Sequence, residues 1–283
     1  MPIEGSLTAL RRAALAVCVM HDLDLVPTSG GIALTGHPVV PVDWTECLLA
    51  VGHADPESDE GRERLARWLL ARRWLADRPD DGIAAMARPV GLPVGHALHP
   101  GAAWVRRRVL GDALDLGIGL VGLAPGRPDD VVVVPDEALA AAGVDAVALW
   151  PAARGYLERM GAMAAARWAR APGAALRPMG DCDVVTLLGS AQLRRALVAG
   201  EAGGMRAVAA PMRTRGWLDL ARIDPAFALA AAAATAPADR GFERPVLVTA
   251  EEVVLAKADG RPAEIVLRDP SAKQSWERDV LYR

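Results

Sequence analysis

The chain has 283 residues, of which 52% are hydrophobic and 24% are charged, and its net charge at pH 7 is −3. A chain of this length and composition can bury a sizeable core without disulfides or a structural metal. The small negative charge argues against a general nucleic-acid-binding protein, because such proteins carry a large basic excess.

Three features predict a cytoplasmic protein that has no membrane association. The N-terminal residues lack the charged segment and apolar run of a secretory signal. No apolar stretch reaches the roughly 18 residues that a membrane-spanning helix needs. The three cysteines (Cys18, Cys47 and Cys182) are widely spaced and suggest no disulfide framework, as expected in a reducing compartment.

The first hundred residues are predicted to be mainly helical. Apolar residues recur at helical spacing over 6–21, and 43–46 resembles a capping box that begins a short helix ending at Val51. The strongest helix pattern covers 56–76, where acidic residues favour the start and arginines favour the end. A shorter helix is expected over 81–87.

The sequence changes character after Arg88. Prolines and glycines punctuate an irregular stretch over 88–101, which is the best candidate for a domain boundary. Helices are then expected over 104–110, from Pro135, over 151–169, over 190–199 and from Asp224. Strands are expected over 113–123, 131–134, 144–149, 184–188, 205–210, 246–249, 253–256 and 265–267.

This order of elements predicts an α/β protein, with a mixed α+β arrangement as the alternative. A mainly helical part, 1–100, would be followed by a sheet-containing part, 101–283, in which strands and helices alternate. A single compact domain agrees equally well with the sequence.

All five histidines and two of the three cysteines lie in the first hundred residues. The candidate metal ligands among them are Cys18, His21, His37, Cys47 and His53. A zinc or iron centre needs three or four such ligands that converge from different segments. No Cys-x-x-Cys or His-Glu-x-x-His spacing is present, and both cysteines lie in apolar helical stripes. The alternative is therefore that they are buried core residues, and a redox-active thiol would instead need exposure and a lowered pKa.

Three further residues are weak candidates for catalysis. His96 and His99 could act as general bases. Pro100 biases His99 away from helix, and residues three apart in an extended segment point to opposite sides, which weakens a shared metal site. Cys182 lies between two aspartates, whose charges would raise the thiol pKa and oppose a nucleophilic role.

A glycine pattern over 117–122 matches Gly-x-Gly-x-x-Gly. Dinucleotide binding needs a helix N-terminus directly after the glycines, to hold the pyrophosphate. Pro125, Gly126 and Pro128 follow instead. We therefore predict a glycine-containing strand at this position rather than a nucleotide site.

The densest polar stretch, 211–217, follows a predicted strand, where α/β proteins place ligand-binding loops. Arginines at this position could hold a carboxylate or phosphate through two hydrogen bonds. The predicted ligand-binding residues are Arg213, Arg215, Trp217 and Asp224. The alternative is that Arg213 or Arg215 pairs structurally with Asp219 or Asp224.

Segments of the last third, 211–217, 224–227, 240–245 and 276–283, resemble conserved actinobacterial proteins of unknown function. The resemblance brings no catalytic residue with it. It implies a cytoplasmic bacterial setting.

Two functions agree with these patterns. The first is an enzyme or binding protein for a small anionic compound held near 211–217, with the histidine-bearing N-terminal part supplying acid–base or metal chemistry. The second is a non-catalytic homo-oligomer or a redox- or metal-linked regulator that uses the N-terminal histidines and cysteines. The sequence identifies no cofactor.

Overall fold

The computed structural model describes residues 3–76, 78, 80–96, 99, 104, 106–108, 111, 113–171, 175–218, 230, 233–236 and 239–255. Contacts divide the chain into two compact units. The first unit takes Met1–Ala87, Pro100–Val105 and Ile118–Trp150, and the second takes Arg88–His99, Arg106–Gly117 and Pro151–Arg283. The chain thus first leaves the first unit at the start of the predicted boundary, 88–101, and returns to it twice.

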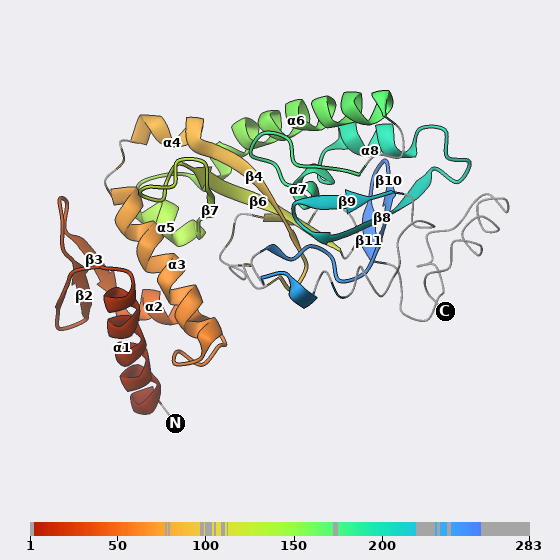
Figure 1. The fold of residues 1–283 in the computed structure, drawn as a ribbon. Helices are drawn as coiled ribbons and strands as arrows, with labels where there is room; N and C mark the ends of the chain where they lie inside the picture. The colour runs from red at the N-terminus through yellow and green to blue at the C-terminus, as the bar shows by residue number, and fades with distance from the viewer. Residues whose placement is uncertain are drawn as a thin grey trace. The chain divides into compact units, whose positions relative to one another are not determined.

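The first unit combines helices with a three-stranded antiparallel sheet (Figure 1). Its first elements are α1 (Ile3–Met20), β1 (Leu25–Pro27), β2 (Gly31–Leu34), β3 (Val40–Asp43), α2 (Trp44–Val51), α3 (Asp59–Ala76) and α4 (Asp80–Met86). Later segments add β7 (Val131–Val133), α5 (Asp136–Ala141) and the 3₁₀ helix η2 (Ala146–Leu149). Helix α3 packs against α1, α2 and α5, so it is the central element of this unit.

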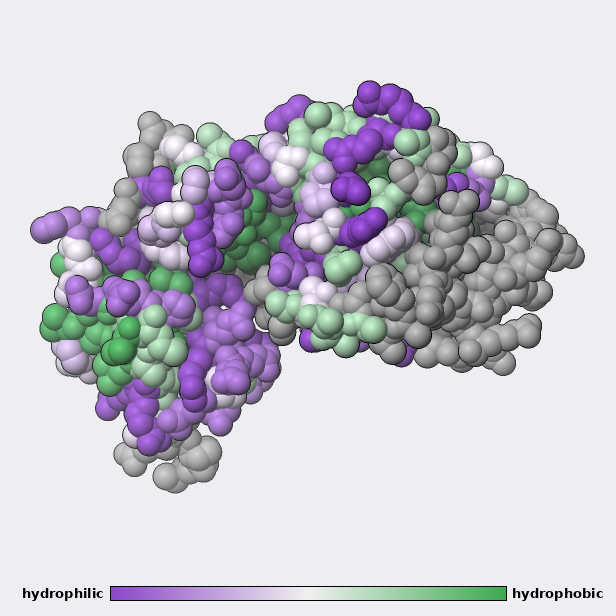
Figure 2. All heavy atoms as spheres, viewed as in Figure 1, coloured by the Kyte–Doolittle hydropathy of each residue, from purple (hydrophilic) through white to green (hydrophobic). Residues whose placement is uncertain are grey.

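Apolar residues from α1, α2, α3 and the sheet form the core of the first unit. The side chains of Leu10, Leu34, Cys47 and Leu65 are completely buried there. Figure 2 shows that apolar residues also gather on the surface over β2, β3 and α1. Exposed large apolar side chains in α1, in β1 and in the turn before β3 include Leu15, Val19, Met20, Val26 and Val39.

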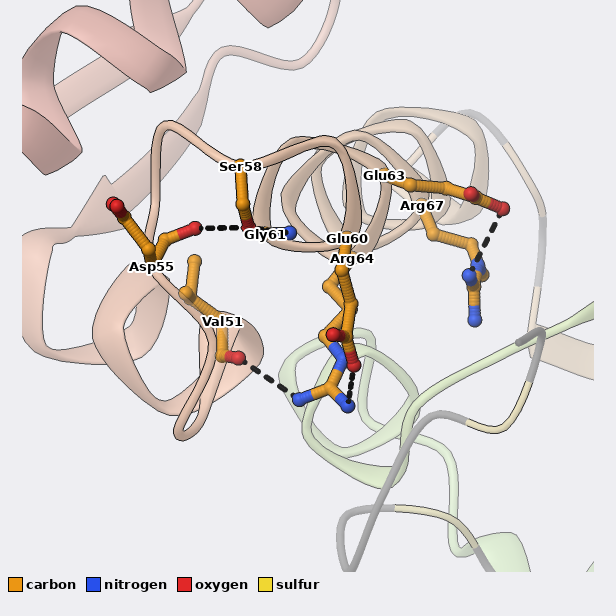
Figure 3. Close-up of polar contacts among 8 residues, drawn as sticks. All are labelled: Val51, Asp55, Ser58, Glu60, Gly61, Glu63, Arg64 and Arg67. Carbon is orange, nitrogen blue, oxygen red and sulfur yellow. Dashed lines mark hydrogen bonds and ion pairs between the residues drawn. The ribbon is translucent and has the colours of Figure 1, made fainter. Parts of the chain in front are cut away.

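Local hydrogen bonds fix the two helices that follow the sheet. Asp43 accepts from the backbone of α2 and Glu46 accepts from the Asp43 amide, which confirms the predicted capping box. Figure 3 shows the connection to α3, where the Arg64 guanidinium donates to the Val51 carbonyl at 3.0 Å and to Glu60 at 2.6 Å. Arg64 thereby ties the end of α2 to the first turns of α3.

The second unit places helices beside a four-stranded antiparallel sheet of order β11-β10-β8-β9. These strands are β8 (Met205–Met212), β9 (Arg215–Trp217), β10 (Val246–Thr249) and β11 (Val253–Leu255). The helices are α6 (Trp150–Arg170), α7 (Val184–Leu187) and α8 (Ala191–Val198), and α8 packs on β8 and β10 (Figure 1). The helix predicted over 190–199 is confirmed as α8, and Ser190 caps it, since its side chain accepts from the Leu193 amide.

A further sheet contains β4 (Ala87–Pro93), β6 (Leu114–Val121) and β5 (Arg106–Arg108) in the order β4-β6-β5, and β7 also pairs with β6. Gly117 lies opposite Arg106 and Gly119 lies opposite Val133. The glycine pattern over 117–122 is thus part of a strand, as predicted.

The mixed α+β alternative is confirmed, with the N-terminal helices followed by sheets. Four local predictions are wrong. The segment 104–110 contains strand β5 rather than a helix, because β6 offers it antiparallel partners. The stretch 88–101, expected to be irregular, begins with β4, and the sheet of β1, β2 and β3 lies where the sequence predicted no element. Residues 144–149 form η2 instead of a strand, since the Asp145 carboxylate accepts from the Val147 amide.

The fourth of these errors concerns 184–188, a predicted strand that is helix α7. The side chain of Asp183 accepts from the Thr186 amide and so begins the helix. Most of the predicted alanine-rich helix after Asp224 and the predicted strand over 265–267 lie outside the described residues. Within the described ranges, no helix is long and apolar enough to cross a membrane.

Candidate functional site

A cavity of about 760 Å³ opens in the first unit between the end of α1, the second half of α3 and the loop that follows β6. Its lining residues are His21, Asp22, Leu23, Asp24, Thr35, Leu70, Arg73, Trp74, Ala124, Pro125 and Arg127. Small-molecule sites in proteins are typically clefts of about 300–1,000 Å³ with apolar walls and a few polar groups. The cavity has the size and the mixed lining of such a site.

The first wall is the turn from α1 into β1. The backbone of Asp22 has φ of 52°, a left-handed conformation that aspartate tolerates better than most residues. The Leu23 amide donates to the Cys18 carbonyl at 2.9 Å, and the Thr35 amide donates to the Asp24 carbonyl at 2.8 Å. These bonds fix the backbone of the turn, while the side chains of Asp22 and Asp24 remain exposed to solvent.

The second wall is one face of α3. Leu70, Arg73 and Trp74 are three and four residues apart, which places them together on the helix surface. Nη1 of Arg73 donates to the Pro38 carbonyl at 3.0 Å. Gly36 has φ of 140°, and a Cβ at this position would collide with the Arg73 guanidinium. The absence of a side chain at Gly36 therefore lets the guanidinium lie against the backbone.

The third wall is the loop 122–130, whose prolines argued against a dinucleotide motif. Nη2 of Arg78 donates to the Gly122 carbonyl at 2.7 Å, and the Gly122 amide donates to the Asp130 carbonyl at 3.3 Å. Arg127 and Asp130 form an exposed ion pair at 3.6 Å. The base of the loop is thus held, and the Arg127 side chain at the cavity makes a long, solvated contact with Asp130.

Charges of both signs line this cavity. Arg73 and Arg127 supply two guanidinium groups, and Asp22 and Asp24 supply two carboxylates. Within the part of the chain that the structure describes, neither of these carboxylates makes an ion pair or a side-chain hydrogen bond. His21, in the turn directly after α1, adds an exposed imidazole to the lining of the cavity.

A smaller cavity of about 390 Å³ adjoins the first, because His21 and Leu70 line both. Its other lining residues are Met20, Asp59, Arg62, Glu63, Ala66 and Arg67. Arg67 lies 3.2 Å from Glu63 one turn away on α3, so these two charges partly neutralise each other (Figure 3). We assign no separate role to this smaller cavity.

The predicted N-terminal histidine and cysteine cluster is not gathered at one centre. Burial raises the pKa of Cys18 to about 11, and burial together with nearby Glu46 raises the pKa of Cys47 to about 12. His37 and His53 are exposed in turns, and only His21 lies at the cavity. No group of three or more potential metal ligands occurs among the residues described.

The predicted arginine loop is the tight turn between β8 and β9. Nε and Nη2 of Arg213 contact the Asp183 carboxylate at 2.8 and 2.5 Å, so the structural partner of this arginine is Asp183. Arg215 is exposed and its guanidinium lies 5.3 Å from the centre of the Trp217 ring. Asp224 lies outside the described residues. The loop therefore presents one arginine that is already paired and one that is exposed.

The remaining catalytic candidates lie in the second unit. Nε2 of His99 lies 3.0 Å from the carboxylate of buried Asp115, and Nε2 of His96 donates to the Arg240 carbonyl at 3.0 Å. Cys182 is completely buried, and burial, with the charges of its two aspartate neighbours, raises its pKa to about 12. These features oppose a role for Cys182 as a nucleophile.

Sequence reasoning missed most of the cavity. In the sequence, Arg73 is only one of the arginines that favour the end of the helix over 56–76, and Asp22, Asp24 and Arg127 belong to no motif. The residues that meet here come from segments as far apart in the chain as 21–24 and 124–127. The one local signal was the arrangement of Leu70, Arg73 and Trp74 on one helix face, which combines an apolar, a cationic and an aromatic residue. No protein-family model, curated protein or solved structure matches this chain.

Proposed function

We propose that the protein binds a small organic anion in the cavity of the first unit. The observation that carries the proposal is that the guanidinium groups of Arg73 and Arg127 line one 760 Å³ cavity together with the ring of Trp74. Guanidinium groups bind carboxylate and phosphate through paired, charge-assisted hydrogen bonds. An aromatic wall beside them would accept the apolar body of such a ligand.

The state of Arg127 supports this proposal. Its contact with Asp130 is long, at 3.6 Å, and the two side chains are 74% and 56% exposed. Exposed ion pairs of this kind contribute about 1 kcal/mol or less. Arg127 would therefore lose little if it exchanged this contact for a ligand carboxylate.

The contacts of Arg213 favour the cavity over 211–217 as the anion site. Two nitrogens of Arg213 already contact the Asp183 carboxylate, and both residues are largely buried. An incoming anion would have to compete with that carboxylate.

The experiment is isothermal titration calorimetry of the full chain with indole-3-propionate, an aromatic carboxylate. The variants are Arg127→Gln and Trp74→Leu, and the matched control is Arg154→Gln, an exposed arginine on α6 in the second unit. We expect Arg127→Gln to weaken binding by at least about tenfold, because a hydrogen bond to a charged group contributes about 1.5–3 kcal/mol. Arg154→Gln should bind like the parent.

Two results would contradict the proposal. One is the absence of any binding of either indole-3-propionate or L-tryptophan, a second indole carboxylate, by the parent protein at millimolar concentration. The other is equal affinity in the parent, Arg127→Gln and Trp74→Leu. Arg127 is exposed, so loss of binding in Arg127→Gln with an unchanged thermal unfolding midpoint reports on the site rather than on folding.

A further inference from the structure

We infer that the ligand of this cavity is a zwitterion, a compound that carries an ammonium group as well as a carboxylate on an apolar body. This inference rests on the proposed function, because it assigns Arg73 and Arg127 to the carboxylate. It goes beyond that function in assigning Asp22 and Asp24 to the ammonium group.

The first step is that Asp22 and Asp24 have fixed backbones and unused carboxylates. The turn that carries them is held by the hydrogen bonds from Leu23 to Cys18 and from Thr35 to Asp24. Neither carboxylate has an ion-pair or hydrogen-bond partner among the described residues. Two acceptors on a fixed turn at a cavity lose little conformational freedom when they bind a donor.

The second step is the balance of charge. Arg73 and Arg127 bring positive charge to the lining and Asp22 and Asp24 bring negative charge, and the charge of Arg127 is partly offset by its exposed ion pair with Asp130. A ligand with only a carboxylate would enter against the field of two unpaired carboxylates, and a ligand with only an ammonium would enter against two guanidinium groups. Like charges brought together at a site disfavour binding. A zwitterion is the class of ligand that can make favourable contacts with both the guanidinium groups and the carboxylates.

The third step is that the two signs come from different walls. The guanidinium groups belong to α3 and to the loop 122–130, whereas the carboxylates belong to the turn between α1 and β1. The site therefore has polar groups for two separate ends of a ligand. Trp74, on the same face of α3 as Arg73, can accept the apolar body and can also attract an ammonium over its ring.

The test uses three compounds that share one ring system: L-tryptophan, which is a zwitterion, indole-3-propionate, which lacks the amine, and tryptamine, which lacks the carboxylate. Calorimetry with the full chain should give L-tryptophan an affinity at least about tenfold above that of either partner compound. The double variant Asp22→Asn/Asp24→Asn should lose this advantage, and it should bind indole-3-propionate at least as tightly as the parent does, because two like charges are removed from the lining. The control is Asp129→Asn, an exposed aspartate that does not line the cavity.

The outcomes separate this inference from the proposed function. If indole-3-propionate binds at least as tightly as L-tryptophan, the inference is wrong and the anion site stands. If L-tryptophan keeps its advantage in the double variant, the amine is recognised elsewhere and the inference is also wrong. If neither L-tryptophan nor indole-3-propionate binds, or if tryptamine binds best, the proposed function itself is wrong and so is the inference.

Discussion

The Arg213 guanidinium contacts a single oxygen of Asp183, with Nε at 2.8 Å and Nη2 at 2.5 Å from Oδ2. The other oxygen of the same carboxylate accepts from the Thr186 amide at 2.7 Å. One aspartate therefore joins the β8–β9 turn to the start of α7. The arginine that the sequence marked as a ligand-binding residue stabilises the second unit.

This relationship predicts that Asp183→Ala lowers the free energy of unfolding by about 2–3 kcal/mol, because the change removes a helix cap and leaves a largely buried guanidinium unpaired. Arg213 and Asp183 have side chains only 14% and 20% exposed. Urea denaturation followed by circular dichroism measures the effect. The control is Arg215→Ala, an exposed neighbour whose removal should change the unfolding free energy by about 0.5 kcal/mol or less. Equal effects of the two substitutions would contradict the assigned role of Asp183.

We expect two glycines on α6 to respond in opposite ways to substitution by alanine. A Cβ at Gly161 would collide with the side chain of Ser190, whereas a Cβ at Gly155 would meet only the end of the Arg159 side chain, at 3.6 Å. Gly161→Ala should therefore destabilise the protein by about 1–3 kcal/mol through overpacking. Gly155→Ala should stabilise it by about 0.5–1 kcal/mol, because alanine favours helix. Thermal unfolding midpoints that move in the same direction for both variants would show that α6 does not approach Ser190 so closely.

The buried thiols predict slow alkylation of the native protein. Burial raises the pKa of Cys18, Cys47 and Cys182 to about 11, 12 and 12, so each stays protonated well above pH 8. Thiolate is the reactive form of cysteine. Iodoacetamide at pH 8 should leave all three unlabelled in native protein and label all three in denaturant, as mass spectrometry would show. Rapid labelling of Cys18 or Cys47 in the native state would instead support the redox-linked alternative.

The sequence predicts an element correctly where the contacts that stabilise it come from residues nearby in the chain. The Asp43–Glu46 capping box correctly predicted the start of α2, and Ser190 correctly predicted the start of α8. The pattern failed at Val184–Leu187, because its β-branched residues favour a strand while Asp183 caps a helix there. Arg213, the other partner of that aspartate, is 30 residues away along the chain.

The cavity could not be predicted for a related reason. No single segment holds more than part of it, since Asp22, Arg73 and Arg127 belong to three elements separated by about 50 residues each. The sequence analysis expected anion binding at arginines and placed them at 211–217, where a dense polar loop follows a strand. The folded structure decides how firmly each arginine is already paired: Arg213 makes short contacts with the largely buried Asp183, whereas Arg127 makes a long, exposed contact with Asp130.

Strand β6 is divided between the two units, and this division limits when each unit can complete its folding during synthesis. Leu114–Gly117 belong to the second unit and Ile118–Val121 to the first. Helix α5, which packs on α3, also follows β6 in the chain. Because synthesis proceeds from the N-terminus, the first unit is incomplete until Trp150 has left the ribosome. By then, two segments of the second unit, Arg88–His99 and Arg106–Gly117, have already been synthesised. The remainder of that unit, which begins at Pro151, has not.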